Sequence, residues 1–462
     1  MSIEGSTRAP LTSDKSMPWI GEYHAEWTPT PLRALLKRKS SRVGRNFNNF
    51  DLLSLTLTGV IKRNLEGMKG KFPTSFETYQ EVKPGDFVFC LFDVEETPRA
   101  VGLSSITGMI TGAYTVYEPR GAINSDFLSR MLHYCDEKKR FKTLYRGLRN
   151  TIPKSSFEAI KIPVPKMQDQ LLINRYLDHS EVLLSNAING KKDLLKLLQE
   201  RKESIINSKI IPLNISSGEA VESGIKGIDR IPANWQIVKL KNILKSRDIR
   251  SSTGKETKLS VSAAHGVVER ARHAVTMFEA ASYVGHKIVQ PGDLVVNSLW
   301  AWARGLGVAN DHGLVSPVYG VYEVKKINTV DLSYLHLVMR SNRLQWQLQL
   351  ASKGIWRSRY TITPEAFLNL QIPLPSIEVQ EAIVREINAE TRDTENALQS
   401  LKKEIDLLIE YKSNLFAEVI TGRKNVIELA SKLTDLSPEA KAKLQSGLNN
   451  LATEELLEME DE

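Results

Sequence analysis

Hydrophobic side chains, with two threonines among them, recur at alternating spacings of three and four residues along the last third of the chain. The seam runs from Ile387 to Val419, and only Lys412 interrupts it. Such a heptad pattern predicts a coiled-coil helix over 376–423, with Gly422 as a natural C-cap. Its main apolar positions are Ile387, Leu398, Leu401, Ile405, Leu408 and Leu415.

The same phase appears 210 residues earlier and predicts a helix over 166–212, which Pro212 ends. Since each helix follows a globular segment of one chain, an intramolecular antiparallel pair is the economical arrangement. The alternative is that each helix packs only on its own globule. The seam positions of this first helix are Leu177, Leu184, Ile188, Leu195, Leu198 and Ile205.

The chain is an internal duplication. The stretch "IPVPKMQDQ" (162–170) returns as "IPLPSIEVQ" (372–380), "VKPGDFVF" (82–89) as "VQPGDLVV" (289–296), and "GAYTVYE" (112–118) as "PVYGVYE" (317–323). Two copies at this long period indicate a duplicated domain and not a solenoid. The matched residues that begin the helices are Pro163, Pro165 and Gln170, with Pro373, Pro375 and Gln380.

Each copy begins with short strand-like runs and Gly/Pro turns, mixed with a few helical pieces. This pattern predicts two mixed α/β (α+β) globular domains, separated by the helix pair and related by a pseudo-twofold repeat. The predicted division is a mobile tail (1–16), a first globular domain (17–165), a first helix (166–212), a linker (213–227), a second globular domain (228–375), a second helix (376–423) and an acidic tail (424–462).

Charge is unevenly distributed. The chain carries a net charge of +8, but residues 424–462 hold four lysines against nine acidic residues. A basic body suits a protein that binds a polyanion. With two cysteines and no apolar run long enough to span a bilayer, we expect a reducing, cytoplasmic location and no membrane partner.

Catalytic motifs are scarce. The P-loop, GxSxG and HExxH patterns do not occur, and we expect no cofactor or metal bound by this chain. One nuclease-like pattern consists of Asp293 followed by Glu323 and Lys325. The first copy offers Asp86 and Glu118 without the lysine, and Pro-Gly-Asp is also a good turn sequence. We therefore predict a binding protein and no enzyme.

Basic residues cluster where each copy begins. Residues 33–71 contain ten lysines and arginines against two acidic residues, interleaved with Ser and Asn. Such mixtures suit phosphate contacts with base-edge hydrogen bonds, although a solvated loop is the alternative. The candidate DNA contacts are Lys37, Arg38, Lys39, Arg42, Arg45 and Asn46, and in the second copy Arg247, Arg250, Arg270, Arg272 and Arg304.

A further basic pair precedes each helix. "WRSRYTIT" (356–363) holds Arg357 and Arg359 beside Tyr360, and "LYRGLRNTIP" (144–153) holds Arg146 and Arg149 before the same Thr-Ile. Because two domains that read different bases still need the same phosphates, a repeated pair favours backbone contact. Replacing the second pair with alanine should weaken binding without changing the sequence that is read.

The two I-P-x-P-x-x-x-x-Q helices, the "IPANW" that begins the second copy and "GLVSPVYGVYE" together resemble the specificity subunit of type I restriction–modification systems, over about residues 17–423. The resemblance implies target recognition domains on double-stranded DNA, conserved helices, and the Pro and Gln residues at domain–helix junctions and subunit interfaces. It implies a non-catalytic role in phage defence beside two methyltransferase subunits and two motor-nuclease subunits, which use S-adenosylmethionine, ATP and Mg²⁺.

Under this resemblance each domain reads half of a split, asymmetric target, and the helices set the unread spacer. Three other functions stay open on the sequence. They are the specificity subunit of a modification-only system, a stand-alone DNA-binding protein and a Mg²⁺-dependent nuclease.

Overall fold

The computed structural model describes residues 10–63, 76–97, 99–212, 220–270, 282–325, 328–354, 360–437 and 439–440. They fall into two compact units. The first lies within Met1–Gly190 and Ile405–Asp461, and the second within Lys191–Glu404. Each long helix therefore contributes one part to each unit.

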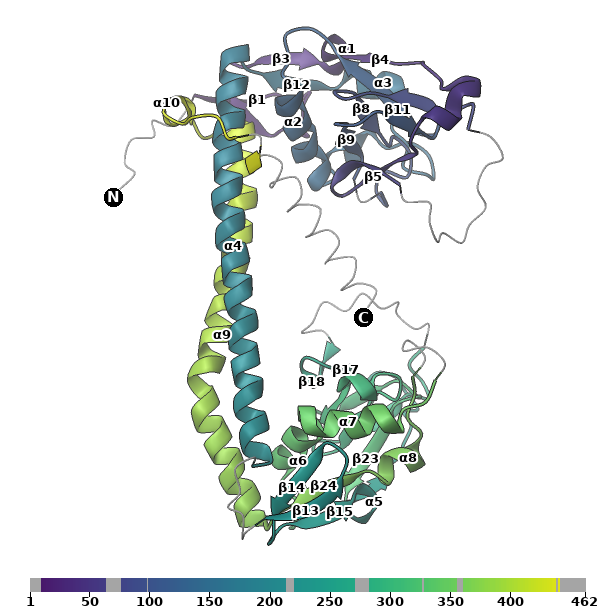
Figure 1. Ribbon diagram of the computed structural model, residues 1–462. Coiled ribbons are helices and arrows are strands. Elements are labelled where there is room, and N and C mark those ends of the chain that lie inside the picture. Colours follow the sequence, from purple (N-terminus) through teal and green to yellow (C-terminus); the bar gives the residue numbers. More distant parts are fainter. Residues whose placement is uncertain are drawn as a thin grey trace. The chain divides into compact units, whose positions relative to one another are not determined.

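The first unit is built on a four-stranded antiparallel sheet (Figure 1). Its strand order is β4-β11-β8-β9. Smaller pairs flank it, and the helix α2 (Ser125–Glu137) buries an apolar face that includes Phe127, Leu128 and Met131. The strands are β4 (Leu36–Arg38), β11 (Thr115–Pro119), β8 (Phe87–Phe89) and β9 (Val101–Leu103), and the pairs are β1·β2 (Leu11–Ser13, Glu22–His24), β3·β12 (Thr28–Pro31, Lys161–Val164), β5·β6 (Leu53–Thr56, Gly59–Lys62) and β7·β10 (Gln80–Val82, Gly108–Ile110).

The second unit repeats this plan strand for strand. Its four-stranded sheet has the order β16-β23-β20-β21, and four flanking pairs recur in the same chain positions. The predicted mixed α/β fold with an internal repeat is thus confirmed. The strands are β16 (Leu244–Ser246), β23 (Gly320–Val324), β20 (Leu294–Val296) and β21 (Leu306–Val308), with the pairs β13·β14 (Ala220–Ile225, Ile228–Pro232), β15·β24 (Gln236–Lys239, Gln371–Leu374), β17·β18 (Leu259–Ser262, Gly266–Glu269) and β19·β22 (Lys287–Val289, Gly313–Val315).

Short helices complete both units. In the second unit, α6 (Leu332–Met339) holds the place that α2 holds in the first, and Asp331 caps it as Asn124 caps α2. The second unit adds α7 (Asn342–Ala351), whereas the first has only a 3₁₀ turn at Arg140–Leu144. The remaining helices are α1 (Leu32–Leu35), α3 (Lys154–Ala159), α5 (Leu240–Ile243), α8 (Pro364–Leu368) and α10 (Ile427–Ser431), with 3₁₀ turns at Gly44–Asn49 and Ala301–Ala303.

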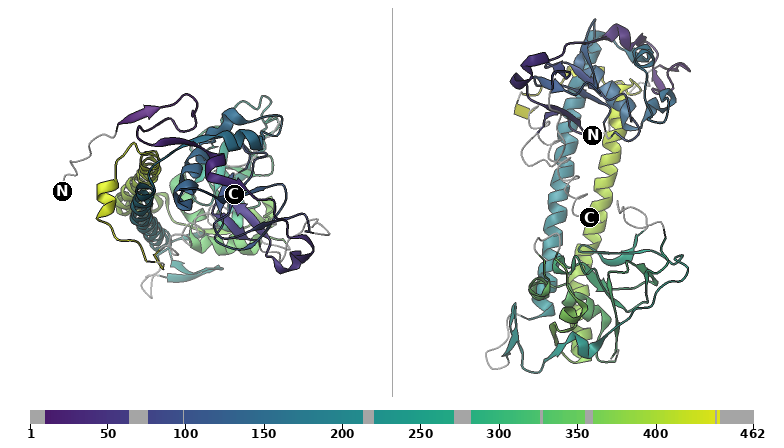
Figure 2. Two further views of the ribbon diagram at one scale, coloured as in Figure 1. Left: turned by 90° about the horizontal axis from the view of Figure 1, so that it is seen from above. Right: turned by 90° about the vertical axis from the view of Figure 1, so that its right-hand side faces the viewer.

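The helices α4 (Met167–Ile210) and α9 (Ile377–Ile420) pack antiparallel within each unit (Figure 2). In the second unit Lys202 binds Glu395 at 2.7 Å, and Lys209 binds Glu386 at 2.6 Å. The predicted antiparallel coiled coil is confirmed. Its seam is buried at Leu177, Ile188, Ile387, Leu398, Leu401, Ile405 and Leu415, and half-buried at Leu184, Leu195, Leu198, Ile205 and Leu408.

Lys412, the one residue that interrupts the seam, has partners in the first unit. Its Nζ lies 2.6 Å from Glu181 Oε1 and 3.2 Å from Ser185 Oγ on α4. A lysine stem can cover apolar surface while its charged end reaches a polar partner. The interruption is therefore an ion pair between the helices, with opposite polarity to the Lys-to-Glu pairs of the second unit.

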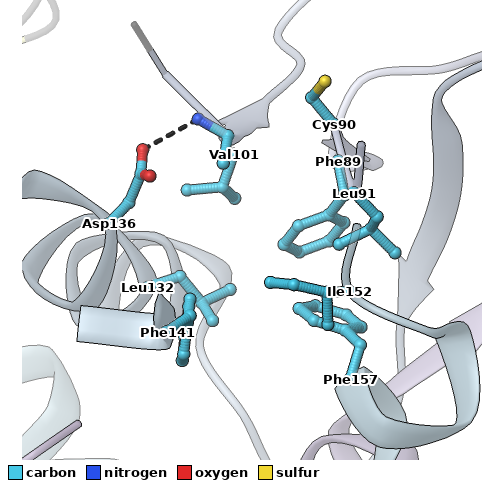
Figure 3. A pocket seen from close by; sticks show the side chains of 10 residues that line it. Phe89, Cys90, Leu91, Val101, Leu132, Asp136, Phe141, Ile152 and Phe157 are labelled. Atoms are coloured by element: carbon cyan, nitrogen blue, oxygen red, sulfur yellow. Dashed lines mark hydrogen bonds between the residues drawn. The ribbon is translucent and has the colours of Figure 1, made fainter. Parts of the chain in front are cut away.

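A small apolar cavity lies inside the first unit (Figure 3). Phe89, Leu132, Phe141 and Phe157 line it, and the carboxylate of Asp136 at its edge accepts a hydrogen bond from the Ala100 amide at 2.8 Å. Since that carboxylate already holds a backbone donor, the cavity presents apolar surface only and offers no catalytic arrangement.

Because of two histidines, we expect the free energy of unfolding to fall at acidic pH. His133 Nε2 lies 3.2 Å from the Val101 carbonyl oxygen, and burial among protein atoms, with Arg99 nearby, lowers its pKa from 6.5 to about 4 even though part of the residue meets solvent. Burial lowers the pKa of His336 to about 4 as well. Because the unfolded chain binds these protons first, the stability they contribute is complete above pH 6.5 and is lost as the pH falls toward 4.

We expect His133→Gln, which keeps a side-chain donor, to flatten this dependence. Between pH 6.5 and 4 the wild-type free energy of unfolding should fall more steeply than that of the variant, by about 1–3 kcal/mol. Urea unfolding at a series of pH values measures the difference. Parallel curves for the two proteins would contradict the assignment.

Candidate nucleic-acid interface

The basic stretch after β4 and the loop after β8 leave the sheet at the same end. Both strands pair antiparallel with β11, so they run parallel to each other. Residues that follow Arg38 and residues that follow Phe89 therefore emerge side by side. Two segments 51 residues apart in sequence thus form one edge of the first unit.

A chain of contacts connects this basic stretch to the basic hairpin before α4. Arg42 forms a backbone bridge with Gln80, whose Nε2 donates to the Tyr114 carbonyl at 2.6 Å. The Tyr114 ring lies 5.9 Å from the Phe92 ring, and the Arg149 guanidinium lies 5.5 Å from the centre of Phe92. The fold brings Arg42 and Arg149 to one end of the sheet.

The hairpin that carries Arg146 and Arg149 is closed by paired backbone hydrogen bonds. Arg146 N donates to Thr151 O at 2.8 Å, and Thr151 N donates back at 3.0 Å. Gly147 and Asn150 take the left-handed backbone conformation that such a tight turn requires, with φ of 68° and 43°. The turn therefore holds a fixed shape.

Arg149 is braced against the loop after β8. Its Nε donates to Asp93 Oδ1 at 3.0 Å, its Nη2 contacts Oδ2, and the Arg149 carbonyl accepts from Asp93 N at 2.8 Å. The side-chain hydrogen bond from Arg149 holds the pKa of the Asp93 carboxyl below its usual range. The guanidinium nevertheless stays largely exposed, so a phosphate can still approach it.

The second unit repeats the frame with different residues. Arg250 bridges Lys287, and Lys287 Nζ donates to the Tyr319 carbonyl at 2.8 Å, as Gln80 does to Tyr114. The Tyr319 hydroxyl accepts from Asn297 at 3.0 Å, at the start of the loop after β20. The hairpin before α9 is closed by Lys353 and Thr361, with hydrogen bonds of 2.9 and 3.0 Å.

Tryptophans occupy the loop after β20. Trp300 and Trp302 stack with ring centroids 5.6 Å apart, and Tyr360 packs edge-on against Trp302 at 6.0 Å. Tyr360, a candidate DNA contact, is therefore engaged with an aromatic ring next to the second hairpin. Arg357 and Arg359 of the same hairpin lie outside the described residues.

The buried Pro-Gly-Asp aspartates of both units hold half-buried cations. Asp86 Oδ2 accepts from Lys39 Nζ at 2.6 Å and from Lys83 N at 2.7 Å. In the second unit Asp293 accepts from Gln290 N at 2.8 Å, and Arg247 lies 3.4 Å away. Lys39 and Arg247, both candidate DNA contacts, thus place their charges on carboxylates of their own sheet.

This pairing also explains the nuclease-like pattern. Arg247 binds Glu323 as well, at 3.2 Å, and burial raises the pKa of Asp293. Lys325 Nζ instead donates to the Lys241 carbonyl at 2.8 Å. The acids form a structural ion-pair network, and the described part of the chain contains no group of three His, Cys, Asp or Glu residues able to hold a metal ion.

The other candidate contacts differ in exposure. Lys37 is exposed and pairs with Glu118 at 2.8 Å, and Arg304 reaches Glu203 of α4 and Asn342. Arg270 is half-buried, and Arg272 lies outside the described residues. The exposed candidates near the sheet end are Arg38, Arg42, Arg45, Asn46, Arg146 and, in the second unit, Arg250. Of these, Arg250 pairs with the exposed Asp248 at 3.1 Å and donates to the Gly285 carbonyl at 3.2 Å.

The glutamine of each I-P-x-P-x-x-x-x-Q motif ties a long helix to its globule. Gln170 is fully buried, accepts from the Asn124 amide at 2.7 Å and donates to the Pro165 carbonyl at 2.9 Å. Gln380 does the same with Asp331 at 2.9 Å and Pro375 at 2.8 Å. Asn124 and Asp331 are the N-caps of α2 and α6, so one side chain connects two helix starts.

The prolines of these motifs lie in sheet edges. Pro163 faces Pro29 in the β12·β3 pair, and Pro373 faces Ile237 in β24·β15. Proline lacks an amide donor, which an edge position tolerates. The carbonyls of Pro165 and Pro375 bind the buried glutamines, so the whole motif forms the domain–helix junction.

The frame that connects the basic loops was missed from sequence alone. Gln80 and Lys287 are different residue types, and what they share is one hydrogen bond from the side chain to the carbonyl of a tyrosine. The one available signal was the offset. Arg42 and Arg250 are 208 residues apart, within the range of the recurring motifs.

No family model matches the chain. A solved chain from work on complex assembly and conformational transition of the type I R-M system shares the fold, with a TM-score of 0.53, 13% identity, and coverage of 87% of this chain and 99% of that one. The HsdS subunit of Thermoanaerobacter tengcongensis aligns with a TM-score of 0.41 at 15% identity, over 86% and 97% of the two chains.

The fold is thus that of a chain from a type I R-M system. In sequence, the chain is 23% identical over 341 residues to the specificity subunit of the type I restriction enzyme MjaVIII from Methanocaldococcus jannaschii, which covers 70% of this chain and 76% of that protein. The chain is thus a homologue of that specificity subunit, in agreement with the resemblance of the duplicated motifs. Its described helices include none long and apolar enough to cross a membrane.

Proposed function

We propose that this chain is the DNA-recognition subunit of a type I restriction–modification complex and that its two units read two different half-sites of one asymmetric target. The observation that carries the proposal is that the two units share the same strands and loop positions but have different residues in the loops. Both units place a basic loop at one end of an equivalent sheet, and in both a bridged pair of residues closes a hairpin ahead of the long helix, Arg146–Thr151 in the first unit and Lys353–Thr361 in the second.

The segments on that frame differ between the units. After Arg42 the first unit forms a 3₁₀ turn at Gly44–Asn49, with Arg45 and Asn46 exposed. After Arg250 the second unit forms a tight loop in which Ser251 Oγ donates to Glu256 at 2.7 Å. The strands and bridges that the two units share would supply the same phosphate contacts in both half-sites. The loops that differ would supply different base contacts, as a bipartite asymmetric target requires.

The partners follow from the family of its homologues. Two methyltransferase subunits would bind S-adenosylmethionine, and two motor-nuclease subunits would use ATP and Mg²⁺. The antiparallel helix pair would fix the unread spacer between the half-sites. A modification-only complex, without motor subunits, fits the same recognition role.

Co-expression with a methyltransferase subunit tests the proposal. Adenine methylation at one bipartite motif should appear only when both chains are present, and long-read methylation sequencing detects it. Methylation at the same motif without this chain would contradict the proposal. Cleavage of DNA by the purified chain with Mg²⁺ alone would favour the nuclease alternative.

Arg42→Ala and Arg250→Ala give a matched test of the phosphate role. Each should weaken binding of the assembled complex to its specific DNA, lower the slope of affinity against salt by about one counterion, and leave the methylated motif unchanged. Lys192→Ala, an exposed lysine on α4, is the control. An altered motif in either variant would show that the arginine reads bases.

A further inference from the structure

Leu148, at the tip of the basic hairpin of the first unit, is completely exposed. Its relative accessibility is 105%, whereas the next most exposed large hydrophobic side chain of the described residues, Leu183, reaches 69%. Single exposed leucines are common on protein surfaces. Leu148 differs because its side chain is fully exposed, so the conformation of the turn directs it into solvent. This side chain contributes nothing to the core.

The position of Leu148 is fixed on both sides. The Arg146–Thr151 backbone pair closes the hairpin, and the Ile152 amide donates to the Leu91 carbonyl at 2.8 Å below it. Arg149 next to Leu148 is bound to Asp93 and lies over Phe92. The exposure of Leu148 is therefore built into a braced turn.

The surroundings of Leu148 are cationic. Arg146 and Arg149 flank it and are exposed, and the Phe92–Tyr114–Gln80 contacts place this tip at the same sheet end as Arg42. A protein-binding surface presents a contiguous apolar patch with few charges at its centre. A lone apolar side chain between two arginines suits double-stranded DNA instead. The phosphates outside the duplex can bind the arginines, and the stacked bases inside it can accept the apolar side chain.

We propose that Leu148 is an apolar wedge that enters between two base pairs of the half-site read by the first unit, while Arg146 and Arg149 hold the adjacent phosphates. The proposal rests on the proposed function and adds that this half-site is unstacked and bent. Apolar side chains inserted in this way partly unstack a base step and kink the duplex. In sequence, the second hairpin also has an apolar residue, Ile355, directly after its glycine, Gly354.

The test uses the complex assembled with its methyltransferase subunit and DNA that carries 2-aminopurine at successive steps of the half-site. Wild-type complex should raise the fluorescence at one step other than the adenine that the methyltransferase itself extrudes, because unstacking relieves quenching. Leu148→Ala and Leu148→Gln should abolish that rise and lower the affinity for the specific site about ten- to a hundredfold. Leu429→Ala, an exposed leucine on α10, should retain both.

The possible outcomes separate the two proposals. Thermal melting should be unchanged in both variants, since Leu148 makes no internal contact. A rise away from the methylated adenine that survives in Leu148→Gln, or specific wild-type binding with no rise away from that adenine, overturns the wedge and leaves the proposed function intact. Loss of assembly with the methyltransferase in Leu148→Ala would assign the residue to a protein contact. Absence of specific binding by the wild-type complex would overturn the proposed function itself.

Discussion

Removing one heptad from each long helix is expected to shorten the unread spacer of the target by about three base pairs, since seven residues of helix span about 10 Å. The deletion of 194–200 with 396–402 is suitable. It lies between the Lys191–Glu404 and Lys202–Glu395 ion pairs, so both pairs and the heptad phase on each side are retained. Methylation sequencing of cells expressing the shortened chain and its methyltransferase gives the result.

The bases of both half-sites should stay the same in this variant, because every residue of the two sheet ends is unaltered. Duplication of the same two heptads is the matched control, and it should lengthen the spacer by the same amount. Removal of the heptad from α4 alone should instead break the pair and abolish methylation. An unchanged spacer after the double deletion would contradict a measuring role for the helices.

Gln170→Leu is expected to destabilise the first unit more than any surface change. Leucine fills the space but leaves the Asn124 amide and the Pro165 carbonyl without the partners they now have. Each buried polar group without a partner costs about 1–3 kcal/mol, so the free energy of unfolding should fall by about 2–5 kcal/mol.

Gln168→Leu provides the control for this substitution. Gln168 lies on the same turn of α4 but is exposed, so the same chemical change there should alter the unfolding free energy by less than about 0.5 kcal/mol. Denaturant unfolding of both variants makes the comparison. Equal stability of the two variants would mean that the glutamine does not secure the junction.

The long helices were predictable because their information is local and repeated. The heptad seam runs from Ile387 to Val419, and its copy lies 210 residues earlier with the same phase. The duplication then constrained the rest, since two equal sets of elements in one order imply two equal folds. Lys412 could not be interpreted in this way, because its partner Glu181 is 231 residues away.

The sheet ends were much harder to predict. The strands that form them have only three to five residues, and their partners are distant in sequence. Lys39 shows the consequence. In sequence it continues a run of exposed cations, but in the fold its charge is held by Asp86, 47 residues later. Only long-range pairing separates such structural cations from those, such as Arg42, that face solvent.

Long-range pairing also distinguishes basic residues that the sequence alone makes equally good candidates for DNA contact. Arg247 and Arg250 are three positions apart and equally basic. The structure places Arg247, half-buried, between Asp293 and Glu323, whereas Arg250 is exposed and pairs with Asp248, which is itself exposed. Composition identifies a basic segment, and strand register decides which of its members can reach a ligand.

Site-specific photocrosslinking measures directly whether the two units contact different half-sites. A photoreactive amino acid is placed at Arg42 in one variant and at Arg250 in another, and each complex is irradiated on its methylated target. We predict crosslinks from position 42 to one half-site and from position 250 to the other. Crosslinks from both positions to the same half-site would contradict it.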